Sequence, residues 1–319
     1  MTFNRRILYW GIFLVAAGAV MLVAQSDAVS DDVVAQAMRL WPVVLIALGI
    51  GLLLRRTRFG LAGGMLAAAM PGLLLGGLVV TAPRIGLDCG IGRPVTSATR
   101  QGTFDGQASV DLRLACGDLT VTTVPGTGWL LQAGNTNGRQ AAVDVSANRL
   151  SIASSGRQRF FDLARGGDAW QLSLPVANRL DLAAEVDAGR GRFDLAGAQL
   201  GDVRLAVNAG DARVDLGQAT LAHLSLRVNA ASASLHLPSG SDYGADLSVN
   251  AGSLRVCATS DLGLRVHTQT VLASAKLNGL IRSGDSWESP GYATALHHAD
   301  LAITANVGSV DVNPMGGCQ

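Results

Sequence analysis

The tetrapeptide Val207-Asn208-Ala209-Gly210 belongs to a series that recurs every 21 residues along the middle of this chain. The other copies are Val186-Asp187-Ala188-Gly189, Val228-Asn229-Ala230-Ala231, Val249-Asn250-Ala251-Gly252 and a degenerate Thr270-Val271-Leu272-Ala273. A period near 20 residues is typical of stacked coils, because each coil buries its apolar side only against its neighbours. We therefore expect a regular repeat over about residues 180–279.

Apolar and polar residues alternate on both sides of each copy. In the second copy, Val203 and Leu205 precede the motif, and Val214 and Leu216 follow it. Alternation with a period of two predicts short strands with one buried face. Asn and Gly tolerate the left-handed backbone of a sharp bend. The predicted fold is an all-β repeat domain, similar to a β-solenoid, whose 21-residue coils each contain two strands and a corner.

Stacking would align the outward side chains of successive coils in columns. One column is mostly basic and contains Arg192, Arg213, Ser234, Arg255 and Lys276; the next contains Asp194, Asp215, His236, Cys257 and Asn278. In one interpretation the two columns pair on a solvated face, each pair contributing up to ~1 kcal/mol. In the other, the basic column binds an anionic ligand such as envelope polymer or lipid headgroups. We favour the first, because the acidic column largely cancels the basic one. The column Asn208, Asn229 and Asn250 is interpreted as a hydrogen-bond ladder.

Three apolar segments precede the repeats and raise the mean hydropathy to +0.31. They span residues 7–24, 40–54 and 59–80, and together they make residues 1–82 a predicted module of three transmembrane helices. A span needs ~20 apolar residues, so the first and third suffice, and the second could extend back towards Val33. Two pairs of small residues in the third segment, Gly60 with Gly64 and Gly72 with Gly76, allow close helix packing, within this chain or against another membrane protein.

Positive charges predict the orientation of these segments. Arg5, Arg6 and the cluster Arg55, Arg56 and Arg58 should face the cytoplasm, which places everything after Thr81 outside it. Cleavage of the first segment as a signal peptide is the less favoured alternative, because its apolar core is long. The expected location is the bacterial cytoplasmic membrane, with the N-terminus cytoplasmic and the C-terminal domain extracytoplasmic. The net charge of +1 implies no attraction to nucleic acid.

All four cysteines follow the last apolar segment: Cys89, Cys116, Cys257 and Cys318. This asymmetry agrees with an extracytoplasmic domain in which disulfides persist. Three pairings are open. We favour Cys89–Cys116 and Cys257–Cys318, each of which would tie down one end of the domain.

Outside the regular repeats, residues 83–106 read as a linker and residues 107–319 as the β-domain. Corner-like sequences recur at Cys116-Gly117 and at Asn306-Val307-Gly308. The insertion before the second of these carries the best local candidates for binding, Trp287, Tyr292, His297 and His298. An ordinary capping loop is the alternative and the more favoured interpretation.

Motifs of catalysis are absent from the sequence. No GxSxG, HExxH, phosphate-binding glycine loop or helix-opening GxGxxG occurs. Asp194 and Asp215 could be a carboxylate pair of a carbohydrate-acting enzyme, but flanking arginines fit a salt-bridged face better. We expect no enzyme activity, no cofactor and no metal site.

The sequence resembles a known pair of bacterial modules. The N-terminal part of the chain resembles the transmembrane region of LiaI- and LiaF-type proteins. The matching stretches are residues 6–24 and Leu40-Trp41-Pro42-Val43-Val44-Leu45-Ile46-Ala47-Leu48-Gly49. The later part of the chain resembles toast-rack β-repeat domains. The matching stretches are Trp170-Gln171-Leu172-Ser173-Leu174-Pro175, the Asn-Ala-Gly repeats and Asn306-Val307-Gly308-Ser309-Val310. The resemblance implies an envelope protein of the cell-wall-active antibiotic response type. LiaF proteins act beside a membrane histidine kinase and hold it inactive until the envelope is stressed. The long regular repeat and the four cysteines depart from that pattern.

Two functions follow as expectations. The first is a non-enzymatic, membrane-anchored envelope-stress sensor or regulator that modulates a membrane histidine kinase through helices in the lipid bilayer. The alternative is a structural or adhesive scaffold whose β-domain binds cell-wall polymer, lipid or protein. A homo-oligomer is compatible with both.

Overall fold

The computed structural model describes residues 96–155 and 167–313. The chain divides into two units, Met1–Asp88 and Cys89–Gln319, and all described residues belong to the second. Within the described ranges no helix is long and apolar enough to cross a membrane.

The predicted transmembrane module lies outside the described residues. This applies to all three apolar segments and to the four glycines expected to pack their helices, Gly60, Gly64, Gly72 and Gly76. The three helices and the packing role of these glycines therefore stay predictions.

The described residues form β-strands and one short 3-10 helix. In chain order they are β1 Thr96–Thr103, β2 Ala108–Leu114, β3 Gly117–Val124, β4 Gly128–Asn135, β5 Ala142–Ser146, β6 Arg149–Ala153, β7 Asp168–Pro175, β8 Arg179–Val186, β9 Gly189–Asp194, β10 Gln199–Asp215, β11 His223–His236, β12 Tyr243–Cys257, β13 Leu262–Leu277, β14 Ile281–Ser283, β15 Ser286–Glu288, η1 Tyr292–Thr294 and β16 His297–Val312. The predicted all-β repeat domain is confirmed.

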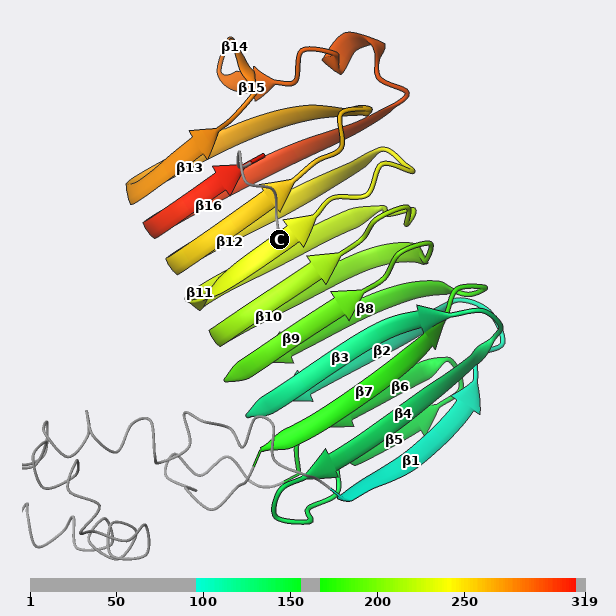
Figure 1. Ribbon diagram of the computed structural model, residues 1–319. Coiled ribbons are helices and arrows are strands. Elements are labelled where there is room, and N and C mark those ends of the chain that lie inside the picture. The colour runs from blue at the N-terminus through cyan, green and yellow to red at the C-terminus, as the bar shows by residue number, and fades with distance from the viewer. Residues whose placement is uncertain (1–95, 156–166, 314–319) are drawn as a thin grey trace, which may run out of the picture. The chain divides into compact units, whose positions relative to one another are not determined.

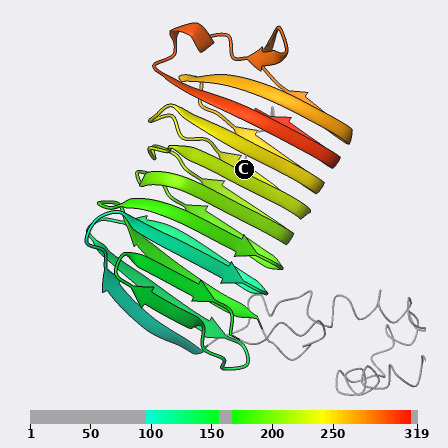
Figure 2. The same ribbon diagram turned by 180° about the vertical axis from the view of Figure 1, so that it is seen from behind.

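The repeats stack as parallel coils in register. Val203 of β10 lies beside Leu224 of β11, and Leu224 lies beside Ala245 of β12, so each step along the stack is one 21-residue period. Each long strand folds over at its corner, which places its first and second halves in two layers (Figures 1 and 2). The alternating apolar residues of both layers meet between them, where Val203 and Val214 are fully buried.

A further coil precedes the regular repeats. Strands β2 and β3 pair in parallel with β8 and β9, and Gly117 lies beside Gly189 at the corner. Beyond this coil, β6 and β5 extend the first layer, while β7, β4 and β1 extend the second layer. The corner predicted at Cys116-Gly117 is therefore present.

Strand β1 corrects the predicted domain boundary. It begins at Thr96, inside residues 83–106 that the sequence suggested to be a linker. The strand pairs along its whole length with β4, from Thr96 beside Asn135 to Thr103 beside Gly128. Its sequence lacks apolar alternation because β1 is an exposed edge strand, and so period-two reasoning could not detect it.

The last strand corrects the predicted order of the coils. Strand β16 lies between β12 and β13, parallel to both, so the fifth repeat is not beside the fourth. Val249 and Thr270 both pair with Ala305 of β16. The chain therefore forms the outermost coil first and then returns to fill the position beneath it, as the red strand in Figure 1 shows.

The corners explain the constant spacing of the repeats. Gly189, Gly210, Gly252 and Gly308 have φ between +118° and +136°, and a Cβ on any of them would collide with a carbonyl oxygen of the neighbouring coil.

The asparagines beside these corners form the predicted hydrogen-bond ladder. Each side-chain amide donates to the neighbouring coil, in the order Asn306 to Asn250, Asn229, Asn208 and finally the carboxylate of Asp187.

Candidate functional site

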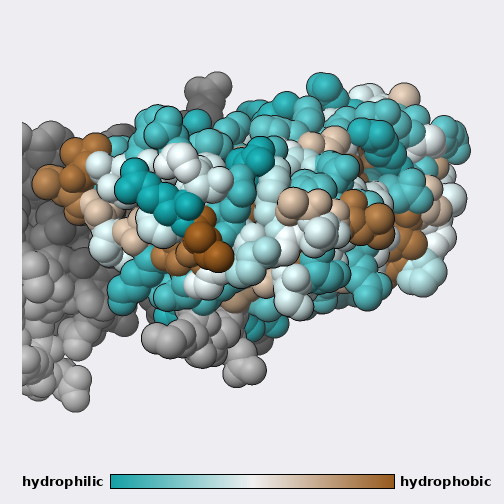
Figure 3. All heavy atoms as spheres, turned by 90° about the horizontal axis from the view of Figure 1, so that it is seen from above, coloured by the Kyte–Doolittle hydropathy of each residue, from teal (hydrophilic) through white to brown (hydrophobic). Residues whose placement is uncertain are grey.

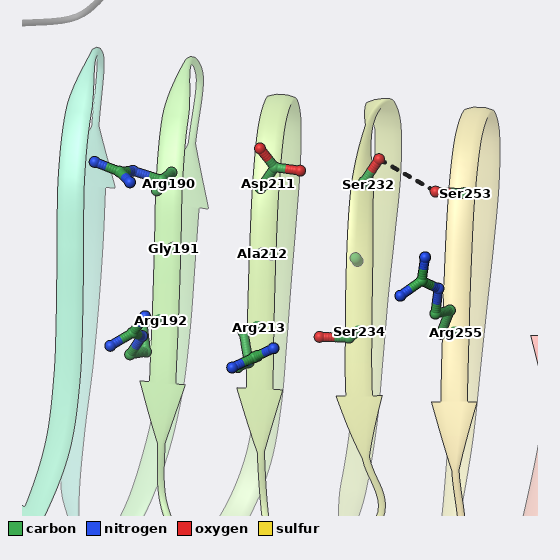
Figure 4. Close-up of a pocket in the computed structure, with 11 residues that line it drawn as sticks. Arg190, Gly191, Arg192, Asp211, Ala212, Arg213, Ser232, Ser234, Ser253 and Arg255 are labelled. Carbon is green, nitrogen blue, oxygen red and sulfur yellow. Dashed lines mark hydrogen bonds between the residues drawn. The ribbon is translucent and has the colours of Figure 1, made fainter. Parts of the chain in front are cut away.

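The outward face of the second layer carries an open groove across four coils. Its lining, which we call the arginine groove, consists of Arg190, Gly191, Arg192, Asp211, Ala212, Arg213, Ser232, Ala233, Ser234, Ser253 and Arg255, and its volume is about 370 Å³. Figure 4 shows the strands side by side, with Arg192, Arg213 and Arg255 extending from the same level of their coils. The groove lies between two columns of outward side chains, and its floor is the backbone at Gly191, Ala212 and Ala233, positions that are themselves buried.

Three arginines of the groove are electrostatically unpaired. In the described part of the chain, Arg192, Arg213 and Arg255 form neither an ion pair nor a side-chain hydrogen bond. The direct ion pairs expected between the two columns are therefore not formed, although Asp194 and Asp215 lie on the same strands as Arg192 and Arg213. Asp215 instead accepts a hydrogen bond from the Gly217 backbone amide at 3.0 Å.

Some of the remaining polar groups of the groove have hydrogen-bond partners. Arg190 binds both oxygens of Asp118, at 2.9 and 3.3 Å. Ser253 donates to Ser232 at 3.2 Å, as the dashed line in Figure 4 marks. Asp211 is the one acid in the lining. Within the lining, four arginines against the single acid Asp211 give a positive charge, while Asp118, Asp194 and Asp215 lie beside the groove.

The opposite face of the coils has a different charge arrangement. Arg113 pairs with Asp111 at 3.1 Å, and Arg204 pairs with Asp202 at 2.9 Å. A second groove on that face combines these arginines with Glu185 and Arg227. In the second groove Arg113 and Arg204 are ion-paired and Arg227 is not, whereas in the arginine groove only Arg190 is ion-paired.

Lys276 does not continue the basic column directly. Because β16 lies between β12 and β13, Asp311 is placed between Arg255 and Lys276. The column predicted from the sequence is interrupted by an acid at this point, and Lys276 does not line the groove. On the other side, Thr120 of β3 lies beside Arg192.

The aromatic and histidine candidates of the insertion lie in a cap over the first half of β13. Trp287 lies beside Val266. The Arg265 guanidinium stacks 4.2 Å from the Tyr292 ring centre and binds Glu288 at 2.9 Å. These contacts raise the pKa of Arg265, chiefly through its hydrogen bond to Glu288.

The two histidines are held by the same cap. His298 contacts the Tyr292 ring edge-on and places Nε2 2.9 Å from the Tyr292 carbonyl oxygen. Its backbone amide donates to Asp242 at 2.6 Å, and His297 Nδ1 lies 3.8 Å from the same carboxylate. The insertion thus uses these side chains within its own chain, as a capping loop does.

The two described cysteines are not free thiols. Cys116 precedes β3 and Cys257 ends β12, with β9, β10 and β11 between these strands. Four ladder steps separate them by about 19 Å, well beyond the Cα separation that a disulfide allows. This distance excludes a bond between them, whereas Cys89 and Cys318 lie outside the described residues. The pairing of Cys89–Cys116 and Cys257–Cys318 stays a prediction.

Among residues 96–155 and 167–313 no group of three or more His, Cys, Asp or Glu side chains could hold a metal ion. Asp194 and Asp215 are neighbours on adjacent coils. They lie beside the unpaired arginines on an open face.

Two family models match this chain. Residues 8–53 match the LiaI-LiaF-like transmembrane region, and residues 100–238 match the N-terminal domain of toast_rack. The first match indicates that the chain is associated with a membrane, and the second agrees with the β-repeat domain seen in the structure. No match to a curated protein was found.

Two crystal structures match this chain at low similarity. One is a candidate cell adhesion protein from Clostridium sporogenes ATCC 15579, with 12% identity, a TM-score of 0.46, and coverage of 68% of this chain and 99% of that chain. The other is a candidate adhesin from Bacteroides fragilis NCTC 9343, with 12% identity, a TM-score of 0.26, and coverage of 68% and 97%. At these scores neither likeness carries an inference about function.

Proposed function

We propose that the β-domain is a non-enzymatic binding module that holds an anionic component of the bacterial envelope in the arginine groove. The observation that supports this is the set of three unpaired guanidinium groups on one open face. Guanidinium is suited to this role because its planar fork matches carboxylate and phosphate oxygens. The serine hydroxyls of the groove add hydrogen-bond donors between the charges.

The spacing of the arginines suits a linear polymer. Coils are about 4.8 Å apart, so Arg192 and Arg213 offer charges one step apart and Arg255 lies two steps further. A chain of phosphates or carboxylates running along the stack would meet several arginines at once. Each exposed ion pair contributes up to ~1 kcal/mol, so the affinity depends on several contacts and falls as salt increases.

In the full chain we propose that this binding informs a regulator. The LiaI-LiaF-like region would anchor the protein with its N-terminus in the cytoplasm and its β-domain outside. Occupancy of the groove would then alter contacts between the transmembrane segments and a membrane partner such as a histidine kinase. The motivation is the order of the two modules in the chain.

Binding is tested with full-length protein in nanodiscs of uncharged lipid. The probes are poly(glycerol phosphate) and uncharged dextran. Replacing Arg192, Arg213 and Arg255 together by Ser should weaken binding of the phosphate polymer at least about tenfold, because three charge contacts are lost. The control variant replaces Arg113 and Arg204 by Ser. These two arginines are ion-paired on the opposite face, so their loss should leave binding of the phosphate polymer nearly unchanged. Equal losses in both variants, or no binding by the wild type, contradict the groove as the site.

Regulation is tested separately in cells. Deletion of the gene should change the output of an envelope-stress reporter, and the triple arginine variant should mimic the deletion at normal protein abundance. Crosslinking of tagged full-length protein should recover a membrane histidine kinase. Recovery of wall-associated proteins alone, with an unchanged reporter, would favour the scaffold alternative.

A further inference from the structure

The outermost strand of the stack has one open edge. Strand β13 pairs with β16 along its whole length. On its other side it pairs with β15 only at Arg265 and Val266. Residues 267–277 therefore have no strand beyond them within the described part of the chain. Such an edge presents unpaired backbone N–H and C=O groups and can accept another strand.

The cap explains why only half of β13 is open. The β14–β15 hairpin lies beyond the first half of β13, in the first layer, as Figure 1 shows at the upper end of the stack. Ser289 holds it by donating its backbone amide to the Leu264 carbonyl oxygen at 2.8 Å. The hairpin stops at Val266, and the second layer ends at β13 itself.

Exposed apolar side chains gather at the same end. Of the six exposed large apolar residues in the described ranges, four lie on β13 and the segment that caps it, and a fifth lies on neighbouring β16: Val271, Leu272, Ile281, Leu296 and Val307. Figure 3, seen from this end, shows hydrophobic patches on a mainly hydrophilic surface. In three repeats the positions of Val271 and Leu272 hold Asn and Ala. The terminal coil thus replaces its polar corner with an apolar one, and Val271 is 75% exposed.

We propose that the open edge of β13 binds an extended segment of another polypeptide as an added strand, with an acidic residue of that segment opposite Lys276. Addition of a strand gives affinity through main-chain hydrogen bonds and specificity through alternate side chains. Val271 and Leu272 would pack against apolar residues at the corner end of the ligand.

Charge supports this choice of ligand. Lys276 is the only charged residue between Thr268 and Leu277, and it is exposed. On the closed side of β13 its cross-strand neighbour is Asp311 of β16. A ligand strand on the open side with an acid at the same level would repeat this pairing, whereas a basic residue there would be repelled.

The cap also disfavours a second copy of the domain as the occupant. The hairpin extends the first layer by two strands beyond β13, which corresponds to about 10 Å. Edge-to-edge pairing of two whole domains would bring the first layer of one copy into the space of the hairpin of the other. A single strand needs only about 4.8 Å beside the open edge and fits next to the hairpin.

The test uses full-length protein in nanodiscs and a fluorescent peptide that copies residues 304–312, the part of β16 that pairs with β13. The wild type should bind this peptide saturably, and the D311K version of the peptide should bind at least about tenfold more weakly. The K276E protein should reverse this preference. The R282E protein is the matched control at the same end of the stack and should keep the wild-type preference. Circular dichroism and thermal unfolding confirm that the variants are folded.

Three outcomes overturn the proposal. The first is absence of saturable peptide binding by the folded wild type. The second is an equal effect of K276E and R282E. The third is that the wild type forms a dimer, that the L272A variant is monomeric, and that the peptide does not dissociate the wild-type dimer. This result would identify a second copy of the chain as the occupant of the edge. None of these readouts depends on the phosphate polymer, so the groove and the edge are tested independently.

Discussion

The side-chain amide of Asn229 donates to the Oδ1 of Asn208 at 2.5 Å, one coil along the stack. The same oxygen and nitrogen atoms repeat from coil to coil, so every amide in the ladder points in one direction. The ladder ends on the carboxylate of Asp187, which accepts from Asn208 at 2.8 Å. Aligned amides polarise one another, and the negative charge lies at the end where the chain of donors terminates.

Interrupting this ladder should destabilise the domain. We expect Asn229→Ala to lower the free energy of unfolding by about 1–2 kcal/mol, because two hydrogen bonds are lost, one of them to the half-buried Asn208. Asn306→Ala, at the open end of the ladder, removes only one hydrogen bond and should lower the free energy of unfolding by less. Urea unfolding followed by circular dichroism measures both variants. Equal losses would contradict cooperation along the ladder.

The corner glycines should tolerate no side chain. Gly210 has φ +118°, and a Cβ there would meet the carbonyl oxygen of Gly189. Gly210→Ala should therefore lower the free energy of unfolding by about 2 kcal/mol or more. Ala231 occupies the equivalent corner without a positive φ, so Ala231→Gly is the control and should cost at most about 1 kcal/mol. A Gly210→Ala protein as stable as the wild type would contradict the packing of the corners.

Tyr243 should make the domain sensitive to alkali. Its side chain is buried, donates to the Pro238 carbonyl oxygen at 3.3 Å, and has a pKa raised by desolvation well above the ordinary value of 10. The folded state holds this proton more tightly than the unfolded state does. The contribution of Tyr243 to the free energy of unfolding is therefore constant below pH ~10, and it decreases as the pH rises above that value. Tyr243→Phe should flatten this decline. Thermal unfolding midpoints across this pH range, with tyrosinate absorbance as a second readout, test the assignment; identical curves for both proteins would contradict it.

Arg265 should hold the cap on β13. It binds Glu288 at 2.9 Å, lies 3.7 Å from Asp300 and stacks on Tyr292. In Arg265→Ala, residues 281–296 should be cleaved faster by a protease while the core coils stay protected. Arg204→Ala removes an exposed pair elsewhere and should leave the cleavage of the cap unchanged. Equal cleavage of the cap in both variants would show that Arg265 does not hold it.

The cysteines provide a test of compartment and connectivity. Non-reduced mass spectrometry of the protein from cell membranes should detect no free thiols, with cross-linked peptides joining Cys89 to Cys116 and Cys257 to Cys318. Two disulfides persist only outside a reducing cytoplasm. Four free thiols would contradict both the pairing and the orientation in the membrane.

The sequence predicted most of the coils and only part of the site. The 21-residue period identified the strands and corners of β8 to β13, because each coil contacts its neighbours with the same residues. It identified Arg192, Arg213 and Arg255 as one column for the same reason. It could not show that these arginines are unpaired, since the orientation of exposed side chains depends on neighbours that a linear pattern does not contain.

The sequence by itself determined the all-β class, the length of a coil and the alternation that selects the buried face, because these are local and periodic properties. Only the tertiary structure decided that β16 enters between β12 and β13, because its 16 residues carry the repeat pattern equally well at either position. That insertion separates Lys276 from Arg255 and leaves the second half of β13 at the end of the stack. Both the limits of the groove and the open edge follow from a long-range pairing, whose energy comes from strands distant in sequence.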